Sequence, residues 1–315
     1  MASEVAGPRA GWIAALLLAV GLLHVRQSPV AAVDVPMTLW VIGAVWAAAR
    51  LLRRDRPHAY LLAALLVGLA GATKYPAAAA WLAIPAAHLL AGRAMADKRL
   101  WATVVVAAAT FFLTSPYVLL DYETFATHFF FQTQHAYSGR GVSGSSAWYH
   151  LTTTLRYGLG WSGLALAAAA TVRVVMNRDV KMGVVLISFA GLFAAVGWGQ
   201  LAFMRYALPL TVLQGVLIAG IVASIRYQPL RLMIVLAAIA EPLYGSVEIA
   251  RLRSRPDTRI EARTWIEAQV PETTPIANFG GWAGDVQLET FEHLWWKVSL
   301  FEKRFGRHEV DRAVD

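Results

Sequence analysis

The sequence predicts an all-α membrane protein, a polytopic bundle of about nine transmembrane helices followed by a small outer C-terminal α(+β) tail. Of its 315 residues, 57% are hydrophobic and 15% are charged, whereas soluble domains have about 45–50% and about 25%. The net charge of +8 is spread over short basic patches between apolar runs, a pattern typical of membrane topology and not of nucleic-acid binding. The absence of cysteine excludes disulfides, thiolate metal sites and cysteine nucleophiles.

Nine apolar windows are the predicted membrane helices, since a spanning helix needs about 20 apolar residues. Eight of them lie between flanking polar residues at 9–26, 34–50, 58–74, 74–93, 99–121, 156–173, 181–205 and 205–226. Several are short, and flanking arginines can reach the interface to compensate. The ninth window, residues 232–247, carries Glu241 and is the weakest; a re-entrant segment is the alternative there.

The basic residues predict which loops are cytoplasmic. One set of alternating loops carries twelve of them and the other set carries four before the tail. The richer loops are expected inside, which places the N-terminus in the cytoplasm and the loop of residues 116–155 outside. The richer set is Arg50, Arg53, Arg54, Arg56, Arg93, Lys98, Arg99, Arg173, Arg178, Lys181, Arg226 and Arg231; the poorer set is Arg26, Lys74, Arg140 and Arg205. Three arginines after the ninth window, Arg251, Arg253 and Arg255, disagree with this topology.

The sequence divides into a bundle of residues 1–250 and an extracytoplasmic tail of residues 251–315. Thr258 and Glu261 have the spacing of a capping box before an amphipathic helix. A second tail helix is predicted from one apolar face, formed by Phe291, Leu294, Trp295, Val298 and Phe301. That helix would lie at the membrane interface or pack against the rest of the tail.

Three outer basic residues are candidates for binding phosphate. Lys74 lies in ATKYPA between two membrane helices, Arg205 lies in FMRYALP before another, and Arg140 lies in the long outer loop. Helix N-termini carry partial positive charge and free N–H groups that suit phosphate. Together the three residues could hold a phosphate or pyrophosphate at the outer surface. Anchoring of helix ends at the interface is the alternative.

The candidate acids are Asp34, Asp121 and Glu123. Asp34, in AAVDVPM, is interpreted either as a helix N-cap or as a charge aimed into an outer cavity. Asp121 and Glu123, in LLDYETF, either contact substrate or simply start a solvated loop. His135 lies in an aromatic stretch near Arg140, where an ordinary hydrogen-bonded histidine is the alternative to a ligand. Metalloprotease, phosphate-loop and nucleophile-elbow motifs are absent, so hydrolase and nucleotide-binding functions lack support.

Four segments together resemble a known group of enzymes: LHVRQSPVAAVDVPMTLW, LLAALLVGLAGATKYPA, SPYVLLDYETF and RYALPL. They resemble bacterial C-superfold membrane glycosyltransferases, the protein O-mannosyltransferase-like and aminoarabinose-transferase-like enzymes, over roughly residues 11–280. The resemblance implies transfer of a hexose or pentose from a polyprenyl-phosphate donor to a lipid, glycan or protein acceptor at the outer face of the inner membrane, as in protein glycosylation or cell-envelope modification.

The same resemblance implies residue roles. Asp34 would be the catalytic acid of an outer loop, and Lys74, Arg140 and Arg205 would face the lipid phosphate. Tyr75, Asp121 and Glu123 are further substrate-binding candidates. His135 lies where some relatives place a metal-binding histidine, so a divalent metal is the one cofactor that the resemblance suggests, and no nucleic-acid partner is expected.

One departure from the family pattern concerns the first outer loop, whose acidic motif usually supplies the base. Here a single helix precedes Asp34, so the chain is expected to be an N-terminally truncated fragment, with an inactive enzyme or an enlarged role for Asp34 as alternatives. Two other functions stay open: a transporter or flippase of lipid-linked glycans, which the nearly uncharged helix interiors disfavour, and a non-catalytic membrane subunit.

Overall fold

The computed structural model describes residues 1–53, 56–138, 145–200, 202–274, 276–278, 286, 288 and 293–295. It divides into two compact units, residues 1–247 and 248–315. The helices of the first part of the chain are α1 (Ala2–Ala6), α2 (Pro8–Val20), α3 (Leu22–Gln27), α4 (Asp34–Arg50), α5 (Pro57–Thr73), η1 (Tyr75–Leu82), α6 (Ala83–Leu90) and α7 (Lys98–Thr114). The later elements are α8 (Tyr117–Leu120), α9 (Tyr122–Ser138), α10 (Ser146–Tyr149), η2 (His150–Thr154), α11 (Leu155–Met176), α12 (Val180–Gly197), η3 (Met204–Ala207), α13 (Leu208–Ala223), α14 (Gln228–Arg253), α15 (Thr258–Gln269), β1 (Ile276–Asn278) and β2 (His293–Trp295).

The predicted all-helical bundle is confirmed. Among the described residues, four helical segments are long and apolar enough to cross a membrane: 146–176, 180–197, 204–223 and 228–269. Three further apolar helices, residues 8–20, 57–73 and 75–90, are shorter. The number of nine spanning helices therefore stays a prediction, and the expected long outer loop contains α8, α9 and α10.

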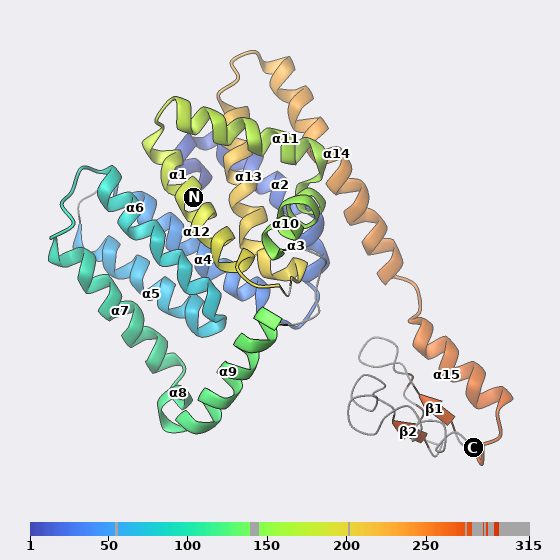
Figure 1. Cartoon of the computed structure of the whole chain (residues 1–315). Coiled ribbons are helices and arrows are strands. Elements are labelled where there is room, and N and C mark those ends of the chain that lie inside the picture. The colour runs from blue at the N-terminus through green and yellow to red at the C-terminus, as the bar shows by residue number, and fades with distance from the viewer. Residues whose placement is uncertain are drawn as a thin grey trace. The chain divides into compact units, whose positions relative to one another are not determined.

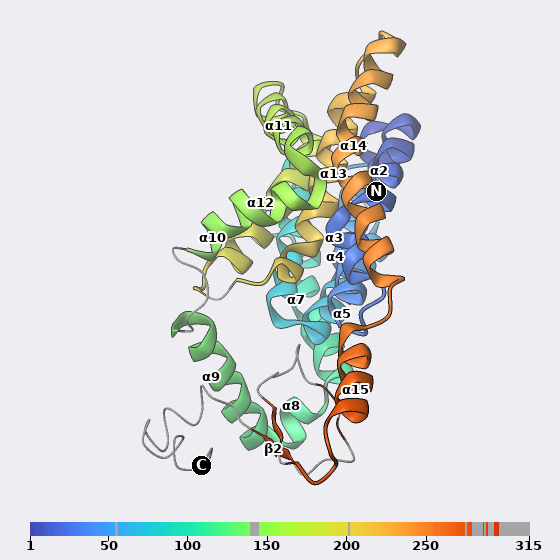
Figure 2. The ribbon, with the colours of Figure 1, turned by 90° about the vertical axis from the view of Figure 1, so that its right-hand side faces the viewer.

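The centre of the bundle is α13, which packs against α2, α11 and α12. In its most apolar stretch, 72% of the residues are buried, compared with 17–33% in the other three candidate spans. Polar residues are scarce in α13, as expected of a helix surrounded by other apolar helices. Figure 2 shows α8 and α9 at one end of this bundle.

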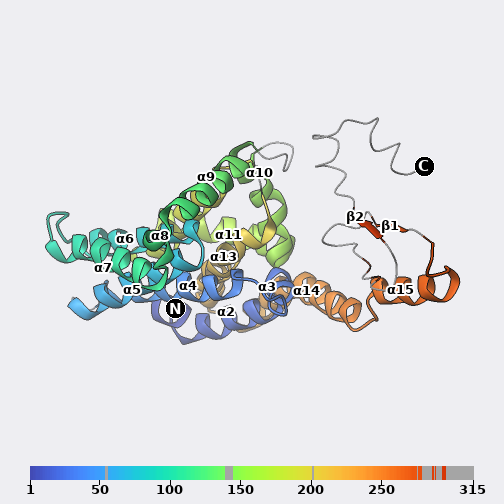
Figure 3. The ribbon, with the colours of Figure 1, turned by 90° about the horizontal axis from the view of Figure 1, so that it is seen from below.

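Small residues allow the N-terminal helices to approach closely. Helix α5 packs against both α4 and α7, and α5 and α7 lie side by side in Figure 3. A Cβ atom at Gly68 would lie 2.6 Å from the carbonyl oxygen of Ala107 on α7, so only glycine fits at this crossing. The close packing holds α4 and α5 together, and these two helices carry Asp34 and lead into Lys74.

Helix α11 is broken at Gly160, where the backbone has φ +78°. The carboxylate Oε2 of Glu241 on α14 accepts a hydrogen bond of 2.7 Å from the backbone N–H of Trp161, the first amide after the break. A Cβ atom at position 160 would lie 2.6 Å from that oxygen. The ninth predicted segment is thus one continuous helix joined to α11 by its single carboxylate.

The second unit differs from its prediction in two places. Asp257, rather than Thr258, caps α15, because its side chain accepts a hydrogen bond from the backbone N–H of Arg259. The predicted second helix is wrong at residues 293–295, which form β2 and pair in parallel with β1; the other residues of that predicted helix lie outside the described part. The spacing of apolar residues within one segment does not reveal that three of them pair as a strand with a segment elsewhere in the chain.

Candidate functional site

Three predicted site residues meet at the ends of three helical segments. Asp34 is the first residue of α4, Lys74 joins α5 to η1, and Arg205 lies within the single turn η3 that precedes α13. Lys74 Nζ donates a hydrogen bond of 2.6 Å to Asp34 Oδ1, and Arg205 Nε lies 3.8 Å from Asp34 Oδ2. The second contact is an ion pair that is too long for a hydrogen bond.

Asp34 does not act as a helix cap in this structure. The N-cap position of α4 is Val33, with no side-chain cap hydrogen bond. The Asp34 residue is 2% exposed, and a buried carboxylate is costly unless it is paired. The ion pairs with Lys74 and Arg205 supply that pairing, so the capping interpretation is wrong.

An aromatic residue completes the group, which we call the Asp34 cluster: Asp34, Lys74, Arg205 and Tyr206. Lys74 Nζ lies 3.6 Å from the centre of the Tyr206 ring, and the Arg205 guanidinium lies 5.8 Å from the same ring. Such contacts stabilise a cation at the ring face. Tyr206 follows Arg205 in the RYALP segment but was not predicted as a site residue. Nothing in a sequence distinguishes an interfacial tyrosine from one that holds a cation.

The electrostatics of the cluster favour an incoming anion. Two cations share one carboxylate, so the group has an excess of one positive charge. Lys74 lies between α5 and η1 rather than inside a helix; burial lowers its pKa, and the hydrogen bond to Asp34 acts in the opposite direction. Arg26 adds a further exposed cation nearby, since its guanidinium contacts the sulfur of Met204, the neighbour of Arg205.

A cavity of about 370 Å³ adjoins this cluster. Its polar lining comes from Lys74, Tyr206, Gln132 and Thr133, and its wall is otherwise mainly apolar. The apolar and aromatic wall consists of Met37, Tyr75, Pro76, Ala77, Phe129, Leu192, Ala195, Val196, Trp198, Pro209 and Leu210, with Gly199. Of the Asp34 cluster, Lys74 and Tyr206 line the cavity, whereas Asp34 and Arg205 are not among the described residues that line it.

The other predicted site residues are placed differently. Tyr75 lines the cavity and meets the ring edges of Phe125 and Phe129 on α9, with ring centres 6.2 and 5.5 Å away. Asp121 and Glu123 are exposed around the start of α9, and no ion pair among the described residues joins them to the Asp34 cluster. Arg140 and the side chain of His135 lie outside the described part. The described residues contain no group of three metal-ligating side chains.

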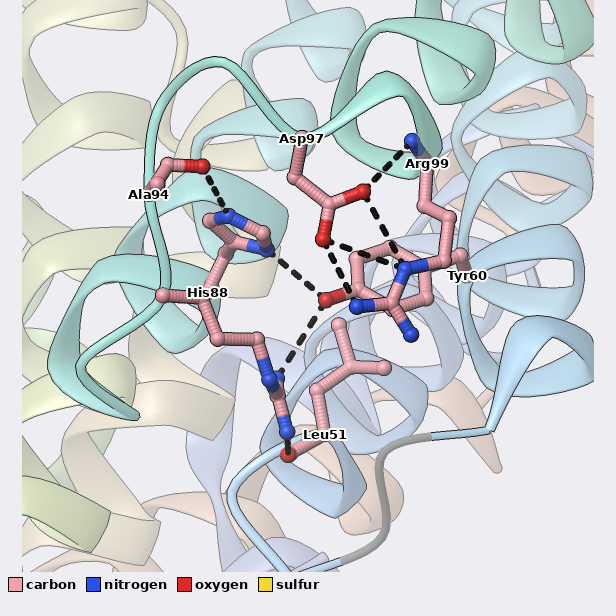
Figure 4. Close-up of polar contacts among 7 residues, drawn as sticks. Leu51, Tyr60, His88, Ala94, Asp97 and Arg99 are labelled. Carbon is pink, nitrogen blue, oxygen red and sulfur yellow. Dashed lines mark hydrogen bonds and ion pairs between the residues drawn. The ribbon is translucent and has the colours of Figure 1, made fainter.

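A second polar group, the His88 cluster, joins α5, α6 and the start of α7 (Figure 4). It consists of Tyr60, His88, Arg93, Asp97 and Arg99. His88 is fully buried, with Nε2 2.8 Å from the Ala94 carbonyl oxygen and Nδ1 2.7 Å from the Tyr60 hydroxyl. Since a carbonyl oxygen only accepts, Nε2 of the His88 ring is the donor to Ala94.

The charged members of the His88 cluster are each satisfied locally. Arg93 donates 2.7 Å to the Leu51 carbonyl oxygen and 3.3 Å to the Tyr60 hydroxyl. Asp97 accepts from the side chain and the backbone N–H of Arg99, and these hydrogen bonds lower the pKa of Asp97 to about 2. Closed hydrogen bonding of this kind stabilises a fold and leaves little for a ligand to bind.

Residues 1–119 match the model of a family described as dolichyl-phosphate-mannose-protein mannosyltransferase. The match confirms the resemblance to protein-mannosyltransferase-like membrane glycosyltransferases, over the segment that carries Asp34 and Lys74. It does not reach Arg205 or the RYALPL segment. No curated protein and no solved structure matches the chain. The apolar helices indicate a multi-pass membrane protein, and the match covers residues 1–119 of the chain.

Proposed function

We propose that this chain binds a polyprenyl-phosphate sugar at the outer face of the membrane and transfers the sugar to an acceptor hydroxyl. The observation that supports this most directly is the juxtaposition of the positively charged Asp34 cluster and a mainly apolar cavity. A lipid phosphate has the two matching parts, an anionic group and a hydrocarbon chain.

Lys74 and Arg205 are the proposed partners of the donor phosphate. Hydrogen bonds between cations and phosphate oxygens are short and strong, and positive charge at the leaving phosphate stabilises the transition state of transfer. Tyr206 keeps the Lys74 ammonium at the cavity wall. The apolar wall would take the first isoprenoid units of the donor, where burial of each methylene contributes about 0.8 kcal/mol.

Asp34 is the proposed base of the reaction. The acceptor oxygen forms a bond to the anomeric carbon while the bond from that carbon to the phosphate oxygen breaks. The acceptor proton passes to the Asp34 carboxylate, and the polyprenyl phosphate leaves with the electron pair, close to Lys74 and Arg205. A base must lie within hydrogen-bond reach of the proton that it takes.

One observation also favours a non-catalytic membrane subunit. Asp34 is almost completely buried and both of its oxygens are paired, which suits a residue that only joins three helical segments. Such a subunit would bind no donor, so a binding measurement separates the two functions.

Reconstitution of the full chain in lipid vesicles tests the proposal. Polyprenyl-phosphate hexoses and pentoses are supplied with lipid, glycan and peptide acceptors, and release of polyprenyl phosphate is measured. We expect turnover with at least one donor, and turnover that depends on Lys74. Failure of every donor to bind to the folded protein would remove the proposed function.

Site-specific labelling tests the outer placement, and the absence of native cysteines makes single-cysteine variants practical. We expect external reagents to label positions in residues 116–138 and to miss positions in residues 173–181, because of the asymmetry of basic residues. External labelling within 173–181 would place the Asp34 cluster on the wrong side.

A further inference from the structure

The pairing of Asp34 conflicts with its proposed role as a base. Its Oδ1 atom accepts a hydrogen bond from Lys74, its Oδ2 atom faces Arg205, and the residue is 2% exposed. A carboxylate that is buried and faces two cations is a weakened base, and an acceptor hydroxyl cannot approach it closely. Something must therefore separate Asp34 from its two cations before transfer.

The cavity supplies a route for that separation. Lys74 lines the cavity, whereas Asp34 lies behind it and is absent from the described lining. An anion that enters the cavity thus meets the Lys74 ammonium before it meets the carboxylate. Arg205 is the more exposed cation, with 46% of its side chain accessible, and its 3.8 Å contact with Asp34 is the looser of the two.

We propose that the phosphate of the bound lipid replaces Asp34 as the partner of Lys74 and Arg205, and that this exchange of ion partners releases Asp34 to act as the base. The exchange rests on the proposed function, because the lipid phosphate is its trigger. It makes the order of binding obligatory: the donor binds first, and only then is the carboxylate free for the acceptor.

The exchange keeps both cations partnered at each stage. In the free protein Asp34 neutralises Lys74, which avoids the large cost of an unpaired buried ion. In the donor complex the phosphate takes over that function, and the released carboxylate turns toward the acceptor. No covalent step or additional reactant is needed for the exchange itself.

The sign of one mutational effect distinguishes this exchange from a structural role. If Asp34 competes with the ligand for Lys74, then Asp34→Asn removes the competitor and should tighten phosphate binding, by roughly tenfold for one hydrogen bond to a charged group. If Asp34 only holds the helices in place, the same variant should bind equally or more weakly. Few site residues improve ligand binding when their charge is removed.

The test measures binding of geranylgeranyl phosphate to the full chain at pH 6, a mildly acidic pH chosen because burial lowers the pKa of Lys74. Wild type, Asp34→Asn and a matched control, Asp97→Asn, are compared by calorimetry. Asp97 also pairs with a cation, Arg99, but belongs to the His88 cluster. We expect tighter binding for Asp34→Asn and unchanged binding for Asp97→Asn. Equal or weaker binding by a folded Asp34→Asn protein overturns the exchange and leaves the proposed function standing; no binding by wild type overturns both.

A second measurement uses the wild-type protein and does not depend on the folding of a variant. Infrared difference spectra of protein labelled with ¹³C at aspartate carboxyl groups are recorded on addition of geranylgeranyl phosphate. We expect one aspartate carboxylate band to shift as its ion pairs are lost. Binding without any aspartate shift contradicts the exchange. Inorganic phosphate is the parallel probe: the same shift shows that phosphate alone is the trigger, and a shift only with the lipid shows that the cavity-bound chain is also required.

Discussion

The Asp34 and His88 clusters contain similar residues but differ in how completely their charged groups are matched by hydrogen-bond partners. In the His88 cluster, backbone carbonyl oxygens accept from Arg93 and His88, and Asp97 is matched by Arg99 alone. In the Asp34 cluster, two cations share one carboxylate, and a cavity lies beside the cluster. The difference teaches that an incompletely matched polar group next to a cavity is the better indicator of a binding site.

The largest expected effect concerns transfer by the Asp34 cluster. Asp34→Asn should lower the rate of sugar transfer by about 10²–10⁴-fold, because removal of a general base usually has that effect. The rate is measured with the reconstituted protein under saturating donor. Asp97→Asn, in the other cluster, should leave the rate within a factor of about three, since the hydrogen bonds of Asp97 are made to its near neighbour Arg99 and not to the Asp34 cluster. Near-full turnover by Asp34→Asn would end the catalytic assignment.

The next effect concerns donor binding. Lys74→Ala should weaken binding of a polyprenyl phosphate by about 1.5–3 kcal/mol, the contribution of a hydrogen bond to a charged group. Lys98→Ala is the matched lysine control at the start of α7, and its effect should be close to zero. Equal affinities of wild type and Lys74→Ala would return Lys74 to a structural role.

The third effect concerns folding and should be confined to the His88 cluster. Tyr60→Phe removes the hydroxyl that joins His88 Nδ1 to Arg93. Loss of this partner of the buried His88 ring should lower the free energy of unfolding by about 1–3 kcal/mol, measured by denaturant titration in detergent. Donor affinity should not change. A loss of affinity equal to that of Lys74→Ala would show that the two clusters are coupled.

The smallest effect is the pH dependence of the His88 cluster. The pKa of Asp97 is lowered to about 2 by Arg99, compared with about 3.9 for an unperturbed aspartate. Its contribution to stability is therefore complete above about pH 4 and is lost as the pH falls toward 2. Comparison of wild type with Asp97→Asn across this interval measures the contribution, and identical pH profiles would contradict it.

The charged residues of the site could be predicted from the sequence, and the apolar cavity beside them could not. Charged residues are so scarce in the apolar segments that Asp34, Lys74 and Arg205 could be selected by their positions at helix ends. The cavity could not be predicted, because Phe129, Trp198 and Leu210 have the same composition signal whether they face lipid, core or ligand. Their arrangement depends on packing between distant helices.

The local geometry of several elements was also beyond the sequence. Asp257 and Thr258 are both good capping residues, so a one-residue difference in the start of α15 could not be resolved. The break at Gly160 depends on Glu241, 80 residues further along the chain. A glycine alone does not predict a helix break, since glycine is common in membrane helices.

The contact between Glu241 and Trp161 has a consequence for the assembly of the protein in the membrane. A carboxylate makes α14 a poor substrate for insertion on its own, with a cost of about 2.5–3.5 kcal/mol for an acidic residue at the helix centre. The broken α11 offers an exposed amide that accommodates this carboxylate. Because α11 is synthesised before α14, we expect the Trp161 amide to be in place when α14 inserts and to offset part of the cost of its carboxylate.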